Sequence, residues 1–173
     1  MDSERYSTDH APTTYKLRSG NRRYGVSLHP SHLARIVELC QRANRVETGG
    51  VLVGHYSSDQ ELAIVTGVSD PPSDSKHSRT RFLRGVHGLQ GWLNRLWSQN
   101  RYYLGEWHYH PCAAPDPSPC DSNQMRDIAF SKSYNTPEPL LLILGGVPHE
   151  KWSVRAFVFV SDKGLVELLP DCQ

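Results

Sequence analysis

Two histidines and an aspartate are spaced so that they could bind one metal ion. His108 and His110 are separated by one residue, and Asp121 follows after a proline-rich segment. Successive side chains of an extended segment alternate between its two faces, so both imidazoles would point the same way. Two imidazoles and a carboxylate leave the fourth position of a tetrahedral site open, as a catalytic zinc requires. We therefore expect one zinc ion per chain at this place.

Two glutamates are candidates for the base that would activate a water molecule at such a metal. Glu47 lies far upstream, at the entrance to the β-rich segment 48–56. Glu106 lies two residues before His108 and is expected on the same face of the strand. For Glu106 the residues alone leave three roles open: a fourth ligand, a hydrogen-bonded partner of an imidazole, or the base.

The tetrapeptide from Ser118 to Asp121 has the pattern of a helix start. Serine suits the N-cap, Pro119 suits the first helical position, and an acidic residue at the third resembles a capping box. Capping alone is the commoner cause of such a tetrapeptide. A helix N-terminus also carries partial positive charge, so a hydroxyl there could cap the helix and still donate to a developing oxyanion.

Taken together, these residues resemble the JAMM motif of the JAB/MPN metallopeptidase family. The resemblance covers roughly residues 20–170 and implies two His ligands and one Asp ligand for zinc, a glutamate base, and a serine that stabilises the oxyanion. One position departs from the pattern, because Tyr109 stands where the family commonly has Ser or Thr; its side chain is expected to face away from the metal. The matching residues are Glu47, His108, His110, Ser118 and Asp121.

The lead-in to the histidines (Gly105–His108) and the following PDPSP segment look like bacterial JAB peptidases that accompany ubiquitin-like conjugation operons in antiphage defence. This resemblance implies an isopeptidase that cuts after the C-terminal residue of a conjugated protein. Two substrates remain open: a ubiquitin-like modifier, and the C-terminal tail of a cyclic-nucleotide synthase of type II CBASS. Operon proteins of the E1 and E2 kinds are further expected partners. The alternatives are a peptidase that processes a sulfur-carrier C-terminus and a non-catalytic MPN-type binding module.

Three arginines gather near the end of a polar, proline-containing loop at residues 70–81. They are Arg79, Arg81 and Arg84. One interpretation is a docking surface for the substrate, and the other is an ordinary solvated basic surface. A long loop in a compact domain is often functional, which is why we retain the first.

Apolar periodicity predicts an α+β fold that is not a regular βαβα succession. The JAB/MPN fold, a curved mixed β-sheet flanked by helices, agrees with this order. Strands are predicted at 22–28, 48–56, 61–68, 101–110, 140–146, 152–160 and 164–169, and helices from Pro30 to near Asn44, over 86–99, and from Ser118 to about Ser133.

The length of 173 residues suggests a single domain. We expect residues 14–170 to form it. The polar, punctuated residues 1–13 are expected to be a disordered tail, and residues 171–173 a short C-terminal tail.

Composition argues against several classes of function. The net charge of +1 provides no basic field for nucleic acid. No apolar run approaches the ~18 residues of a membrane span, and residues 1–14 lack the apolar core of a signal peptide. We therefore expect a cytoplasmic protein without a membrane partner. The four cysteines form no paired CxxC spacing, so a disulfide framework is not expected. Cys112 and Cys120 flank the expected metal loop; they could be spare ligands or a redox control of the site, but we interpret them as two free thiols in a loop.

Overall fold

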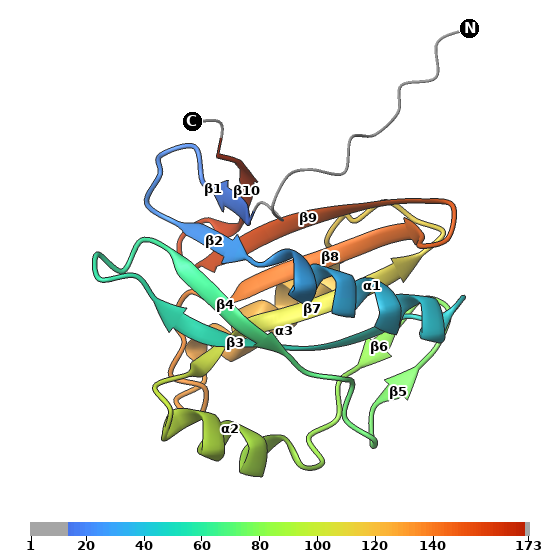
Figure 1. Ribbon diagram of the computed structural model, residues 1–173, viewed down its shortest axis with the longest axis horizontal. Helices are drawn as coiled ribbons and strands as arrows, with labels where there is room; N and C mark the ends of the chain where they lie inside the picture. The colour runs from blue at the N-terminus through green and yellow to red at the C-terminus, as the bar shows by residue number, and fades with distance from the viewer. Residues whose placement is uncertain (1–13, 172–173) are drawn as a thin grey trace, which may run out of the picture.

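The computed structural model describes residues 14–171, in which eight strands close into a barrel in the order β1-β10-β9-β8-β7-β3-β4-β2 (Figure 1). A separate two-stranded hairpin, β5–β6, stands beside it. The sheet is mixed, because β2 pairs with β4 and β7 pairs with β8 in parallel while the other pairs are antiparallel. The strands are β1 (Tyr15–Arg18), β2 (Gly25–Leu28), β3 (Thr48–Tyr56), β4 (Ala63–Val68), β5 (Lys76–His77), β6 (Phe82–Leu83), β7 (Tyr102–Pro111), β8 (Leu140–Val147), β9 (Lys151–Val160) and β10 (Gly164–Pro170), and the helices are α1 (Pro30–Ala43), α2 (Leu89–Trp97) and α3 (Pro119–Phe130).

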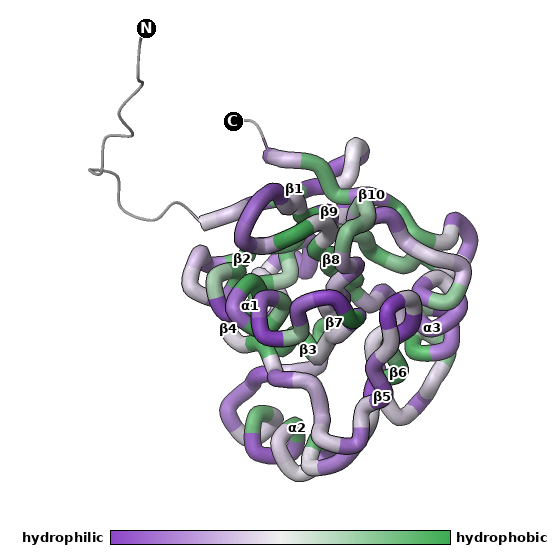
Figure 2. The backbone as a smooth tube through the Cα atoms, turned by 90° about the vertical axis from the view of Figure 1, so that its right-hand side faces the viewer, coloured by the Kyte–Doolittle hydropathy of each residue, from purple (hydrophilic) through white to green (hydrophobic). Residues whose placement is uncertain are grey.

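Two apolar clusters pack against the two faces of the sheet. On one face, the apolar side of α1, which includes Leu33 and Ile36, packs in one cluster with Trp107 and Tyr109 of β7. On the other face, α2 and α3 pack with residues of β8 and β9, among them Leu141, Ile143, Phe157 and Phe159. Figure 2 shows the hydrophobic residues concentrated on the central strands, whereas the segment around β5 is hydrophilic. The predicted α+β fold with a curved mixed sheet is confirmed.

β7 is the strand that positions the histidines, and it is central to the sheet. It lies between antiparallel β3 and parallel β8. A parallel pair needs a crossover connection, and α3 with its flanking loops provides it. The crossover therefore returns the start of α3 to the neighbourhood of the two histidines of β7.

A β-bulge in β7 changes which side chains share a face. Leu52 of β3 pairs with Gly105, but the next residue of β3 pairs with Tyr103, so Leu104 has no partner across this ladder. Gly105 has φ +152°, and a Cβ there would lie 2.0 Å from the carbonyl oxygen of Leu140. The extra residue places Tyr103 on the same face as Glu106, although strict alternation would put them on opposite faces.

Most predicted elements are confirmed within a few residues, and the exceptions have physical causes. The predicted strand 22–28 begins only at Gly25, because residues 20–23 form a turn between β1 and β2; β1 itself was not predicted. The predicted helix 86–99 is shorter, because it begins after Gly88, which has a left-handed backbone. Val86 and Trp97, two apolar residues near the ends of the predicted range, are 66% and 61% exposed and do not join the core.

The predicted tails are mostly outside the part of the chain that is described. Residues 1–13 and 172–173 lie beyond it. Asp171, the first residue of the predicted C-terminal tail, has a side chain that is only 5% exposed and accepts a 2.7 Å hydrogen bond from Nη1 of Arg22. Among residues 14–171, none of the helices is both long enough and apolar enough to cross a bilayer.

Candidate metal centre

The three predicted metal ligands come together in the structure. His108 and His110 project from one face of β7, and Asp121 projects from the first turn of α3. All three are buried, and one ligand atom of each lies within 4.8 Å of the other two. Two imidazoles and a carboxylate are the donor set of a catalytic zinc site with one position left for water or substrate. The residues present therefore fit a divalent metal of the zinc type.

Asp121 contacts both histidines through its two oxygens. Its Oδ1 lies 2.7 Å from Nδ1 of His108, and its Oδ2 lies 3.6 Å from Nε2 of His110. Burial opposes charge on the aspartate, but hydrogen bonds with His108 and Ser118 prevail and lower its pKa to about 2. Burial likewise opposes charge on His108, but hydrogen bonds with Asp121 and Glu106 raise the pKa of that imidazole to about 9. Burial lowers the pKa of His110, and Asp121 only partly compensates.

Ser118 and Asp121 form the predicted capping box at the start of α3. The backbone N–H of Asp121 donates to Oγ of Ser118 at 3.1 Å, and the backbone N–H of Ser118 donates to Oδ2 of Asp121 at 2.7 Å. The Ser118 hydroxyl also donates to Oδ2 of Asp121, at 2.6 Å. The hydroxyl proton is therefore directed at the carboxylate. Its donation to an oxyanion stays a prediction.

Glu47 lies directly before β3 and is half-buried at the same site. Burial raises the pKa of its carboxyl and the nearby charge of Asp121 raises it further, while His108 and a backbone hydrogen bond at Phe82 act in the opposite direction. Its backbone is fixed by the β5–β6 hairpin, because its N–H donates to the carbonyl of Ser78 at 2.7 Å. A carboxyl next to the ligands with a raised pKa is suited to accept a proton from water.

The β5–β6 hairpin also covers one side of the ligands. The ring of Phe82 lies edge-on against His108, with centroids 5.8 Å apart, and the ring of His77 contacts Phe82 in turn. His77 also donates from Nδ1 to the carbonyl oxygen of Glu47, at 2.9 Å. The hairpin thus connects the candidate base to a candidate ligand.

Glu106 is completely buried, and both of its oxygens have partners. Its Oε1 accepts hydrogen bonds from Arg84 and Tyr103, and its Oε2 accepts from Gln124 and lies 3.3 Å from Nε2 of His108. The burial raises its pKa, but His108 and Arg84 together hold the pKa below its usual value. Of the three roles open from sequence, this geometry fits the hydrogen-bonded partner of an imidazole.

The predicted three-arginine surface is wrong for one of its members. Arg79 and Arg81 are exposed at the tip of the β5–β6 hairpin. The side chain of Arg84 is only 5% exposed, because its guanidinium turns inward to bind Glu106, with Nε 2.7 Å from Oε1. Arg84 therefore has no free face for a docking partner, and only the other two can take part in one.

The sequence analysis missed several residues around the centre. Tyr103, Gln124 and Tyr134 all bind the Arg84–Glu106 pair, yet none has a motif spacing to the ligands. The helical period from Asp121 does place Gln124 one turn further along α3, which could have suggested it. Cys112 and Cys120 are free and exposed, as predicted, but only Cys112 lies in a loop, because Cys120 belongs to the first turn of α3.

A pH dependence of metal binding follows from the raised pKa of His108. At neutral pH this imidazole holds a proton in the metal-free protein, whereas a ligand must be neutral. Binding therefore releases one proton, and the apparent affinity should rise about tenfold per pH unit from pH 6 to 8 and level off above pH 9. Competition with a chromophoric chelator of known pH response would measure this. An affinity that is constant from pH 6 to 8 would show that His108 is already neutral.

The amino-acid sequence is similar to that of several known proteins. A family described as prokaryotic homologs of the JAB domain matches residues 29–159. A CD-NTase/cGAS isopeptidase of Enterobacter hormaechei is 40% identical over 135 residues, which is 78% of this chain and 75% of that protein. A CD-NTase/cGAS isopeptidase of Escherichia coli is 30% identical, over 67% of this chain and 77% of that one. The probable metalloprotease y4qB of Sinorhizobium fredii is 31% identical, over 68% of this chain and 73% of that one.

A solved structure supports the fold independently. Protein DSY2949 from Desulfitobacterium hafniense, determined in solution, superposes with a TM-score of 0.60 over 80% of this chain and 86% of that one. At 21% sequence identity, the likeness speaks for the fold alone.

Proposed function

This chain belongs to the family of prokaryotic homologs of the JAB domain and is a metalloprotease of the isopeptidase kind, and we propose that its substrate is a CD-NTase joined through its C-terminus to another protein. The enzyme would cut the bond after the last residue of that tail and release the synthase, in antiviral defence of the CBASS type. The observation that carries the catalytic part is the buried triad of His108, His110 and Asp121 with Glu47 beside it.

The substrate class rests on the relatives. Three similar proteins carry the name CD-NTase/cGAS isopeptidase, and the Enterobacter protein is 40% identical over most of both chains. A ubiquitin-like modifier is the competing substrate within the same chemistry. The E1- and E2-like proteins of such an operon would supply the conjugate that this enzyme removes.

We assign zinc to the triad because two imidazoles and a carboxylate match its preferred donors and leave one position open. Bound there, zinc supplies Lewis-acid chemistry, which acidifies a water molecule and polarises the scissile carbonyl. His108, His110 and Asp121 hold the ion from one side, where β7 and the start of α3 meet. Glu47 is only half-buried, and we expect the substrate to approach on its side of the site.

Glu47 would perform the proton transfers. Its carboxylate takes a proton from the attacking water as the oxygen bonds to the carbonyl carbon, and it delivers that proton to the amine as the C–N bond breaks. Ser118 would donate to the carbonyl oxygen as negative charge develops there. For this, its hydroxyl must turn away from Oδ2 of Asp121, which its proton now contacts.

Arg79 and Arg81 would contribute to docking from the tip of the β5–β6 hairpin. They are exposed, and the hairpin holds the backbone of Glu47. A protein tail that enters the site would pass this basic edge. Arg84 is excluded from the surface because it is bound to Glu106.

The direct test is cleavage of a purified CD-NTase conjugate. Zinc-loaded enzyme should release a synthase whose intact mass shows an unmodified C-terminus, a chelator should stop the reaction, and added zinc should restore it. Matched substrates would be a ubiquitin-like conjugate and a sulfur carrier with a short C-terminal extension. Cleavage of the ubiquitin-like conjugate alone would replace the proposed substrate, and trimming of the extension alone would make the enzyme a processing peptidase. Tight binding of conjugates without any cleavage would make it a binding module.

A further inference from the structure

The carboxylate of Glu106 touches a metal ligand but takes no part in the proposed mechanism. We propose that Glu106 is a positioning residue which fixes the ring of His108 for metal binding, and that the buried Arg84 holds Glu106 in place. The inference rests on the proposed metal site, but not on the identity of the protein substrate. It makes Arg84 a part of the metal centre's support rather than a docking residue.

The first step is the orientation of the His108 ring. Its Nδ1 faces Oδ1 of Asp121 at 2.7 Å, which is the side of the triad, and its Nε2 faces Oε2 of Glu106 at 3.3 Å. An imidazole that binds a metal through one nitrogen must keep its proton on the other. A carboxylate that accepts this proton fixes both the tautomer and the angle of the ring. Glu106 stands at the place where such an acceptor is needed.

The second step is that Glu106 is itself held from three sides. The Nε of Arg84 donates to Oε1 at 2.7 Å, the hydroxyl of Tyr103 donates to the same oxygen at 3.2 Å, and Nε2 of Gln124 donates to Oε2 at 2.6 Å. The side chain is 0% exposed. A carboxylate so engaged has neither a free oxygen for the metal nor contact with water, which argues against the roles of fourth ligand and base.

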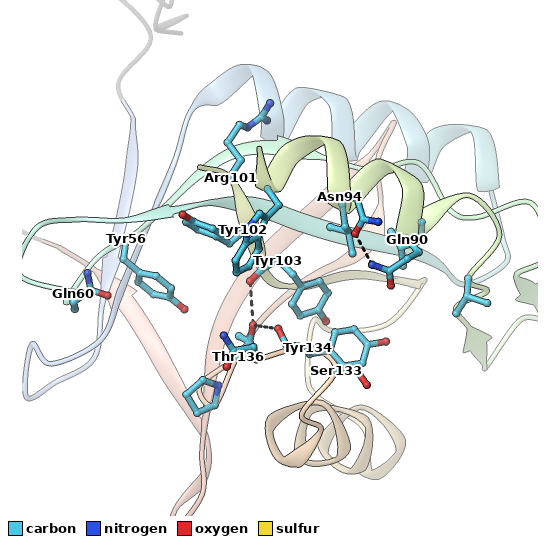
Figure 3. Close-up of a pocket in the computed structure, with 16 residues that line it drawn as sticks. Tyr56, Gln60, Gln90, Asn94, Arg101, Tyr102, Tyr103, Ser133, Tyr134 and Thr136 are labelled. Carbon is cyan, nitrogen blue, oxygen red and sulfur yellow. Dashed lines mark hydrogen bonds between the residues drawn. The ribbon is translucent and has the colours of Figure 1, made fainter. Parts of the chain in front are cut away.

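The third step is the support of Arg84, which comes from a different part of the fold. Its Nη2 lies 2.6 Å from the hydroxyl of Tyr134, and its Nη1 donates to the carbonyl of Gly85 at 3.0 Å. Tyr103 and Tyr134 also line a cavity of about 700 Å³ between α2 and residues 133–137 (Figure 3). The two tyrosines thus contact both the cavity and the ion pair, whose side chains are only 5% (Arg84) and 0% (Glu106) exposed.

The buried Arg84–Glu106 ion pair is not explained by a contribution to folding stability alone. Replacing a buried ion pair by apolar residues is often neutral or stabilising, whereas removing one partner is strongly destabilising. Apolar residues at these two positions could therefore give the same stability. The ion pair does, however, hold the carboxylate of Glu106, and through it the imidazole of His108, at a fixed position.

The test is metal affinity, measured without substrate by competition with a chromophoric chelator. Glu106→Gln should weaken zinc binding about 10- to 100-fold, as is typical when the partner of a ligand is lost. The absorption bands of the cobalt-substituted protein should also shift, because the geometry of His108 changes. The matched control is Asp171→Asn, which breaks another Arg–carboxylate pair with a buried carboxylate, to Arg22 at 2.7 Å in the β1–β2 turn. The control should bind zinc with unchanged affinity.

Glu106→Gln leaves the charge of Arg84 buried and unpaired, so the variant could lose zinc because it misfolds. A second variant separates misfolding from the loss of positioning. Arg84→Gln combined with Glu106→Gln removes both charges and should restore the melting temperature of the metal-free protein without restoring zinc affinity. If the double variant, or a folded Glu106→Gln, binds zinc within twofold of the wild type and has the same cobalt spectrum, the proposal is overturned. That result would leave the proposed function intact, whereas a wild type that binds zinc but cuts no conjugate would refute the function and leave this inference standing.

Discussion

Glu47→Gln is expected to lower the rate of isopeptide cleavage by ~100- to 10,000-fold, the usual contribution of a general base. The amide occupies nearly the same volume as the carboxylate but cannot accept the proton of the attacking water. Zinc content should stay unchanged, because Glu47 is not among the three residues whose ligand atoms converge. Initial rates on a CD-NTase conjugate, paired with elemental analysis of the same samples, would measure both quantities.

The control for this variant is Glu61→Gln, at a glutamate whose side chain is 52% exposed in the connection between β3 and β4. It removes the same charge from the same residue type at the opposite end of β3 from Glu47 and should cleave at the wild-type rate. If Glu47→Gln keeps the wild-type rate with a full metal site, Glu47 is not the base. Loss of zinc in Glu47→Gln would instead show that the carboxylate is a ligand.

The environment of Glu47 gives a physical reason for this assignment over Glu106. The pKa of Glu47 is raised by burial and by the charge of Asp121, so its carboxylate is a stronger base than an exposed one. The pKa of Glu106 is held below its usual value by His108 and Arg84 despite complete burial. Proton transfer needs a group that gains a proton readily and can reach water, and only Glu47 combines these properties.

The metal site could be predicted from sequence because two short-range rules determine most of it. Strand alternation puts His108 and His110 on one face, and the helix-start pattern puts Asp121 in the first turn of α3. The approach of Asp121 to His108, at 2.7 Å, depends on the parallel pairing of β7 with β8, which no local pattern reveals. Only the resemblance to JAB proteins supplied that long-range step.

The residues that hold Glu106 next to His108 could not be predicted either, because their contacts also join distant parts of the sequence. Arg84 follows two exposed arginines, so its local pattern is that of a solvated loop, and its partner Glu106 is 22 residues away. The bulge beside Gly105 interrupts the alternation of β7 before Glu106, and this break, which the sequence does not reveal, brings Tyr103 to Glu106. The predicted start of α2 at residue 86 is too early, because Val86 fits the period of a helix whereas the left-handed backbone of Gly88 delays the helix to Leu89.

Asp121→Asn should abolish stoichiometric zinc binding and, with it, cleavage. Asparagine keeps the shape of the side chain and an oxygen that can accept the backbone N–H of Ser118, so the start of α3 should persist. The charge that binds the metal is lost. The fall in affinity should therefore exceed the 10- to 100-fold typical of losing only the partner of a ligand. Elemental analysis after gel filtration should find about one zinc per chain in the wild type and almost none in the variant.

Asp121→Asn should also change the pKa of His108 while the fold of the site persists. Without the carboxylate, His108 loses the partner that does most to raise its pKa, so its pKa should fall from about 9. The titration of this imidazole by NMR in the metal-free protein would show that shift. Asp127→Asn, at an exposed acid on the same helix whose side chain is 78% exposed, is the matched control and should change neither zinc content nor the titration. If Asp121→Asn retained one zinc per chain, the metal would be held by another donor, and the capping box would be the whole role of Asp121.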